Sequence, residues 1–151
     1  MALWDRIKES AATVQTQLAA RKNELTSGAF RDASIALCAL VTAADGTVDP
    51  AERRRVAQLI AADEVLRNFD AADLQRRFDD WLGRLAADLD FGKVAALQEV
   101  ARTRKKPVEA RAVVQIGIVI GGADGHFDAA ERAVVREACF ALGLPPHEFG
   151  L

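Results

Sequence analysis

One short motif occurs twice in this chain, and the repetition limits the folds that the chain can adopt. The segments 44–53 (ADGTVDPAER) and 123–132 (ADGHFDAAER) lie 79 positions apart, each between two segments of helical apolar spacing. A pattern of helix, Ala-Asp-Gly, turn and helix that recurs in this way indicates one supersecondary unit used twice. We therefore predict two helical hairpins, at about 29–62 and 107–142. Packing about a pseudo-two-fold axis would bring their acidic turns near each other.

Composition and periodicity favour helices along the rest of the chain as well. Alanine is abundant, Tyr is absent and 50% of the residues are hydrophobic, as in a globular and largely helical protein. Apolar residues recur at helical steps over 1–25, and we expect that helix to end at Ser27-Gly28. The run 112–123 alone is also typical of a buried strand, but its match to 33–44 favours a helix. We predict an all-α fold of about seven helices in a single compact domain, 1–151.

Charge, cysteine content and hydropathy exclude several classes of protein. The net charge of −2 and the pI near 5.7 provide no general attraction for nucleic acid. The two cysteines, Cys38 and Cys139, lie in apolar helical patterns, which favours buried reduced thiols over a disulfide or a reactive site. We see no secretory signal and no apolar run of the roughly 20 residues that cross a bilayer. We expect a cytoplasmic protein, with peripheral membrane contact through the N-terminal helix as the alternative.

The repeated motif places six acids at matching positions: Asp45, Asp49, Glu52, Asp124, Asp128 and Glu131. The order Asp49-Pro50-Ala51-Glu52 is typical of a helix start, with an N-cap, a proline at N1 and an acid at N3. Capping therefore gives four of the six acids a structural explanation. It explains the two aspartates before glycine less well, because many residue types serve in that turn position.

The same spacing also agrees with half of an EF-hand loop. Asp-Gly-x-apolar-Asp-x-x-Glu matches the later ligand positions of such a loop, but apolar or glycine residues occupy the earlier ones, so we reject a complete EF-hand. Two half-loops that face each other would supply enough oxygen ligands for one ion. Since all six candidates are hard oxygen donors, the expected cofactor is Ca²⁺, Mg²⁺ or Mn²⁺ rather than zinc.

A basic segment precedes the second hairpin and is the other candidate site. It contains Arg104, Lys105 and Lys106, and Arg111 follows one turn into the next helix. We interpret these residues either as a solvated loop or as a docking site for an anionic partner, a phosphate or a lipid head group. No aromatic residues interleave with them, which speaks against nucleic acid. We find no phosphate loop, Cys-x-x-Cys or nucleophile elbow, and so expect no enzyme.

At these residues the sequence resembles the tellurite-resistance TerB family. The resemblance is carried by Ala44-Asp45-Gly46, Asp90-Phe91-Gly92-Lys93, Ile116-Gly117-Ile118, the segment Ala123 to Asp128 and the ending Glu148-Phe149-Gly150-Leu151. It implies an all-helical fold built around a pseudo-two-fold pair, and a cytoplasmic role in resistance to tellurite and related stresses. It also implies partners among other tellurite-resistance proteins, including a TerC-like membrane protein, and a metal-binding cluster at the six acids.

Three functions remain open at this point. The first is an interaction module that binds a divalent metal at the acids and docks a partner. The second is a structural adaptor without metal, in which the acids serve only as caps and turn residues. The third is an enzyme acting on the tellurium oxyanion, which we rank last because tellurite reduction needs a redox cofactor or reactive thiols, and both cysteines are predicted to be buried.

Overall fold

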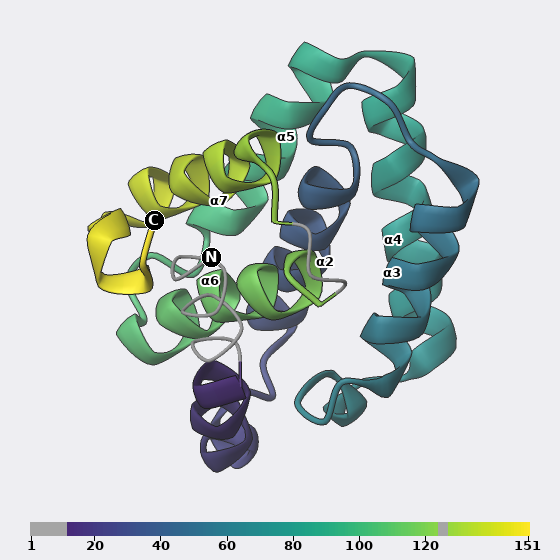
Figure 1. Ribbon diagram of the computed structural model, residues 1–151. Helices are drawn as coiled ribbons and strands as arrows, with labels where there is room; N and C mark the ends of the chain where they lie inside the picture. The colour runs from purple at the N-terminus through teal and green to yellow at the C-terminus, as the bar shows by residue number, and fades with distance from the viewer. Residues whose placement is uncertain (1–11, 124–126) are drawn as a thin grey trace.

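The structure, a computed structural model, describes residues 12–123 and 127–151, and within these ranges it contains helices and no strand (Figure 1). The all-α prediction of about seven helices is confirmed. The N-terminal helix is described over 12–20. The other elements are η1 (Lys22–Glu24), α2 (Gly28–Thr42), α3 (Pro50–Ala62), η2 (Leu66–Asn68), α4 (Ala71–Ala87), α5 (Leu89–Ala101), α6 (Pro107–Gly121), α7 (Ala129–Leu142) and η3 (Pro146–Phe149).

Helix α2 forms the centre of the molecule. It packs against α3, α4, α5, α6 and α7, and nearly all of its residues from Ala33 to Thr42 are fully buried (Figure 1). A helix that is apolar on every side must be surrounded by other elements, because no face of it is suited to water. The buried hydroxyl of Thr42 donates a hydrogen bond to the carbonyl of Cys38 at 2.8 Å, so this polar group needs no partner outside the helix.

Helices α2 and α6 approach each other closely because α6 carries glycine at the contact. A Cβ at Gly117 would stand 2.6 Å from a methyl carbon of Leu37, and one at Gly121 would stand 2.9 Å from Val41. Gly117 lies against Leu37, and Gly121 lies against Val41 one turn later in both helices. Helices α2 and α6 therefore run in the same direction where they touch. Both helices therefore end on the same side of the pair, and the two acidic turns begin there.

The segment 112–123 was the ambiguous one in the sequence, and it is helical up to Gly121. Its β-branched residues are buried against α2 and α7, which outweighs their weak preference for strands. Helices α2 and α3 occupy the range of the first predicted repeat unit, and α6 and α7 occupy that of the second. The pseudo-two-fold axis between them stays a prediction. Cys38 and Cys139 are free and fully buried, as expected.

One predicted boundary is wrong. Ser27 and Gly28 do not end the N-terminal helix, because that helix stops at residue 20 and η1 follows it. Ser27 is instead the N-cap of α2, its hydroxyl accepting a hydrogen bond from the Phe30 N–H at 3.1 Å. A serine before a glycine is compatible with either role, and the burial of Leu25 and Phe30 on both sides decided between them.

No helix among the described residues is long and apolar enough to cross a membrane.

Candidate functional site

The turn between α2 and α3, residues 43–49, is called here the first joint. The Asp45 carboxylate accepts hydrogen bonds from the Thr47 N–H at 3.0 Å and from the Thr47 hydroxyl at 3.1 Å. This side-chain turn surrounds Gly46, whose φ of +90° is a conformation that other residues rarely adopt. Asp45 thus has a structural role that the sequence analysis did not foresee. The metal hypothesis gains less support from this residue than expected.

At the start of α3 the predicted Asp49 cap is present, but the second hydrogen bond of a capping box, from the Asp49 N–H to Glu52, is not among the described bonds. The Asp49 carboxylate accepts a hydrogen bond from the Ala51 N–H at 2.8 Å and is the N-cap of the helix. The predicted capping box is wrong here, because the described bonds at this start include only the Asp49 half of it. The Glu52 carboxylate lies 3.8 Å from Arg55, one turn along the helix, which draws it away from the Asp49 N–H.

The turn between α6 and α7, residues 122–128, is called the second joint. Here both halves of the capping box form: the Glu131 N–H donates to Asp128 at 2.8 Å, and the Asp128 N–H donates to Glu131 at 3.3 Å. Phe127 is buried over Gly121 and Val41, which pulls the start of α7 onto the core. Glu131 is carried inward with it and is only 7% exposed.

Burial changes the acidity of Glu131. The pKa of its carboxyl is raised to about 8, chiefly by loss of solvent and to a smaller extent by the nearby charges of Asp128 and Glu52, while the hydrogen bond from the Asp128 N–H opposes the rise. Among the described residues, no basic side chain forms an ion pair with this carboxylate. Glu131 is therefore an acid that is largely protonated at neutral pH unless a cation approaches it.

The mutual effect of Glu52 and Glu131 shows that the fold brings the two joints within electrostatic range. It does not assemble a complete ligand set: among residues 12–123 and 127–151, no three side chains of the ligating types are grouped closely enough to hold a metal. Asp124, the sixth candidate ligand, lies outside the described residues. The proximity of the joints agrees with the arrangement expected from the repeat, and a shared ion stays a prediction.

The four candidate basic residues divide into two groups. Arg104, Lys105 and Lys106 are exposed in the turn between α5 and α6, and none of them has an ion pair within the described part of the chain. Arg111 belongs elsewhere. Its guanidinium pairs with Glu148 at 3.3 Å and stacks on the Phe149 ring, 4.8 Å from the centroid. We call the first three residues the basic turn.

Sequence reasoning missed a third group of polar residues, which lies beside Arg111. Gln17 lies on the N-terminal helix, Arg21 directly follows that helix, and Gln115 lies on α6. The available signal was Gln115 itself, the one polar side chain in the apolar run 112–123. Its Nε2 donates a hydrogen bond to Oε1 of Gln17 at 3.1 Å, a pairing across 98 positions that local patterns do not reveal.

These features define the class of the protein: it is an all-helical protein with an acidic joint in each of two helical units and a close central contact between α2 and α6. The profile of the family described as "Tellurite resistance protein TerB" matches residues 31–151, and the chain belongs to this family. The chain is also similar to a protein named "Tellurium resistance protein TerB" from Alcaligenes sp. The two are 21% identical over 118 residues, which cover 78% of this chain and 97% of the relative. No solved structure matches the chain. Family membership associates the protein with tellurite resistance.

Proposed function

We propose that this protein acts in tellurite resistance as a protein-interaction module that binds a divalent cation at its two joints. The observation that carries the proposal is the position of Glu131, a buried acid within electrostatic range of Glu52 on the other hairpin. A buried carboxyl whose pKa is raised by burial and by neighbouring carboxylates is stabilised in its charged form when a cation lies beside it. Ca²⁺, Mg²⁺ and Mn²⁺ are the ions that fit oxygen ligands alone.

The hydrogen bonds of the joints leave oxygen atoms for a cation. Among the described residues, the hydrogen bonds of Asp45, Asp49 and Asp128 all end on Oδ1, so the Oδ2 of each is available. Glu131 likewise uses Oε1 in its capping box and keeps Oε2. Because a carboxylate accepts about four hydrogen bonds, capping and metal binding do not exclude each other. A small movement of one joint toward the other would then complete the site.

Thermal unfolding with and without each cation tests the proposal. A cation at about 100 times its dissociation constant stabilises the folded state by about 2.7 kcal/mol, which raises the midpoint by roughly 5–10 °C for a domain of this size. Asp45→Asn and Asp124→Asn should abolish the rise and leave the metal-free midpoint nearly unchanged. Asp70→Asn is the matched control, since Asp70 caps α4 in the same way outside the joints. No rise at millimolar Ca²⁺, Mg²⁺ or Mn²⁺ would sink the cation site.

The alternative function is a structural adaptor without metal. Its support is that Asp45, Asp49, Asp128 and Glu131 each accept a hydrogen bond inside the protein. Under this alternative the same variants change stability only through lost turns and caps, and no cation has an effect.

The basic turn is the proposed docking surface of the module. Its three cations, which form no ion pair with any described residue, suit an acidic surface on a partner, such as another tellurite-resistance protein or a TerC-like membrane protein, and not nucleic acid. We place the protein in the cytoplasm, at the inner face of the membrane when docked. Replacing Arg104, Lys105 and Lys106 by Gln should reduce co-purification of the partner, whereas Arg102→Gln, which removes a cation paired with Glu99, should not.

We propose no catalytic role for the chain. Burial raises the pKa of both thiols, that of Cys139 to about 11, so neither forms the thiolate that reductive chemistry needs. Rapid labelling of both cysteines in the folded protein would contradict this and favour an enzyme.

A further inference from the structure

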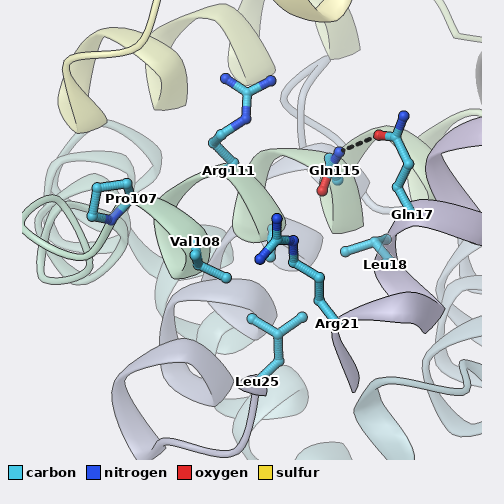
Figure 2. A pocket seen from close by; sticks show the side chains of 9 residues that line it. Gln17, Leu18, Arg21, Leu25, Pro107, Val108, Arg111 and Gln115 are labelled. Atoms are coloured by element: carbon cyan, nitrogen blue, oxygen red, sulfur yellow. Dashed lines mark hydrogen bonds between the residues drawn. The ribbon is translucent and has the colours of Figure 1, made fainter. Parts of the chain in front are cut away.

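A cavity of about 270 Å³ opens between the N-terminal helix, the turn that follows it and α6 (Figure 2). Its apolar wall is formed by Leu18, Leu25, Val108 and Ala112. Leu18 and Leu25 are fully buried beneath it. The volume is just below the roughly 300–1,000 Å³ of ordinary small-molecule sites, so it suits a ligand with a few carbon atoms. The basic turn and the two joints contribute no residue to the lining.

The polar part of the lining consists of donors, with two arginines and two amides. Arg21 and Arg111 extend from different elements, and Figure 2 shows the Arg21 guanidinium beside α6 while Arg111 extends from that helix toward the C-terminal segment. Gln17 and Gln115 are joined by their one hydrogen bond, which leaves the Gln17 amide nitrogen free to donate. None of the lining residues carries a negative charge.

The start of α6 adds to the positive potential of the cavity. Pro107 and Val108 line the cavity and form the first turn of that helix, whose N-cap Lys106 supplies no side-chain acceptor. The first N–H groups of a helix carry a partial positive charge, and an acid is stabilised near them. The cavity therefore combines the Arg21 guanidinium, the Gln17 amide and a helix start, while Arg111 lines it but directs its guanidinium to Glu148 and Phe149.

The carboxylates that already pair with the two arginines do not block the cavity. Glu24 lies 3.2 Å from Arg21, and Glu148 lies 3.3 Å from Arg111, and in each pair both side chains are about half exposed. Exposed ion pairs contribute little stability, and each guanidinium has five N–H donors of which the pair uses one nitrogen. Arg21 can therefore bind a further anion without losing a strong contact.

We propose that this cavity binds a small organic anion, with a phosphate or carboxylate at the Arg21 and Gln17 end and a short hydrocarbon chain against Leu18, Leu25 and Val108. The two chemical requirements are separate: the donors select the charge, and the apolar wall selects the chain. The site lies at the first turns of α6, whereas the proposed cation site lies beyond the last turn. The two proposals stand or fall independently.

The test is an NMR titration of the ¹⁵N-labelled protein in a chelating buffer, so that the cation site plays no part. The probes are pentyl phosphate, hexanoate, inorganic phosphate and pentylammonium. Each buried CH₂ group strengthens binding about fourfold, so burial of two groups makes pentyl phosphate bind at least tenfold more tightly than inorganic phosphate. The affected amides should include Gln17, Val108 and Gln115. The tighter of the two organic anions identifies the preferred head group.

Two variants with the same loss of charge separate the cavity from a general surface effect. Arg21→Gln should weaken binding of pentyl phosphate about tenfold or more, and Lys105→Gln in the basic turn should leave it within twofold. Arg21 is exposed, so neither variant is expected to lower the melting midpoint. The proposal is overturned if inorganic and pentyl phosphate bind equally or both variants weaken binding alike. Equal binding of pentylammonium, or shifts confined to 102–106, would also overturn it.

Discussion

The two joints have nearly the same sequence and different environments. In the first joint the acids lie at the surface: Asp45 closes a turn with Thr47, Asp49 caps α3, and Glu52 points to Arg55. In the second joint Phe127 packs on the core, and Glu131 completes the capping box while almost buried. The first joint has the smaller Val48 at the position that the buried Phe127 occupies in the second. The difference in environment accompanies this change of residue.

The comparison teaches that a repeated motif fixes which residue caps each helix, whereas the capping bonds and the burial differ between the copies: Asp49 accepts from the Ala51 N–H and Asp128 from the Glu131 N–H. Capping is local, since it requires only residues three positions apart. The exposure of Glu131 depends instead on how closely α6 approaches α2 at Gly121, a contact between residues about 80 positions apart. The same acid at N3 is therefore a half-buried side chain in one copy and a buried acid with an altered pKa in the other.

The largest expected effect concerns pH. The Glu131 carboxyl has a pKa of about 8 in the folded protein and near 4.5 in the unfolded chain. Below 4.5 both states are protonated and the contribution of Glu131 to stability is fully present. As pH rises toward 8, only the unfolded chain releases the proton, so the free energy of unfolding falls, by about 5 kcal/mol at most. Urea unfolding at pH 5, 7 and 9 in chelator measures this fall.

Glu131→Gln should flatten the pH dependence between pH 5 and 9, because the amide does not titrate. Glu52→Gln should keep most of it, since burial is the main cause of the raised pKa and Glu52 a minor one. Equal flattening by the two variants would show that mutual repulsion, rather than burial, distinguishes the joints.

The second-largest effect on stability is expected at Gly121, whose contact with Phe127 and Val41 buries part of the second joint. Gly121 takes the place that Thr42 has in the first copy, and a Cβ there would stand 2.9 Å from Phe127 and from Val41. Gly121→Thr should lower the free energy of unfolding by about 2–3 kcal/mol through overpacking. Gly83→Ala is the control, because its Cβ would meet no atom within 4 Å. It should be neutral or stabilise by up to about 1 kcal/mol through helix propensity.

The third effect compares the two caps. Asp128→Ala should lower the free energy of unfolding by about 1–2 kcal/mol, because the N–H of Glu131 loses its acceptor in a partly buried setting. Asp49→Ala should cost about 1 kcal/mol or less, since the exposed Ala51 N–H can bind water. Chemical unfolding of both variants at pH 7 measures the difference, and a larger loss for Asp49→Ala would contradict the assigned environments.

The smallest effect is expected for amide substitutions in the first joint. Asp49→Asn and Asp45→Asn keep an oxygen that accepts the same hydrogen bonds, so in chelator each should change the free energy of unfolding by less than about 0.5 kcal/mol. Denaturant midpoints measure the change. A loss above about 1 kcal/mol would mean that the negative charge itself stabilises the apo protein, as a capping role alone does not require.

Much of the fold could be predicted because its signals are local. The starts of α3 and α7 follow from an Asp at N-cap and an acid at N3, and the end of α7 follows from Gly143, which has a φ of +70°. The repeat identified α6 as a helix against its β-branched composition. The error at Ser27-Gly28 arose because these residue types suit both the end of one helix and the start of the next.

The candidate sites were predicted less completely. The sequence identified the six acids, and it explained the caps, but it did not reveal that Asp45 bonds to Thr47 or that Glu131 is buried. It grouped Arg111 with the basic turn, whereas the structure places its guanidinium on Phe149 and Glu148. The cavity beside it was not predicted, since it is formed by segments almost 100 positions apart.

By itself the sequence determined most of the helix boundaries, the N-cap residues of α3 and α7 and the resemblance to the TerB proteins, because these features depend on neighbours a few positions away. The tertiary structure alone decided that Glu131 is buried more deeply than the matching Glu52, that α2 and α6 end on the same side, and where a cavity remains. Those properties depend on how closely distant helices pack, and the two glycines of α6 set that distance.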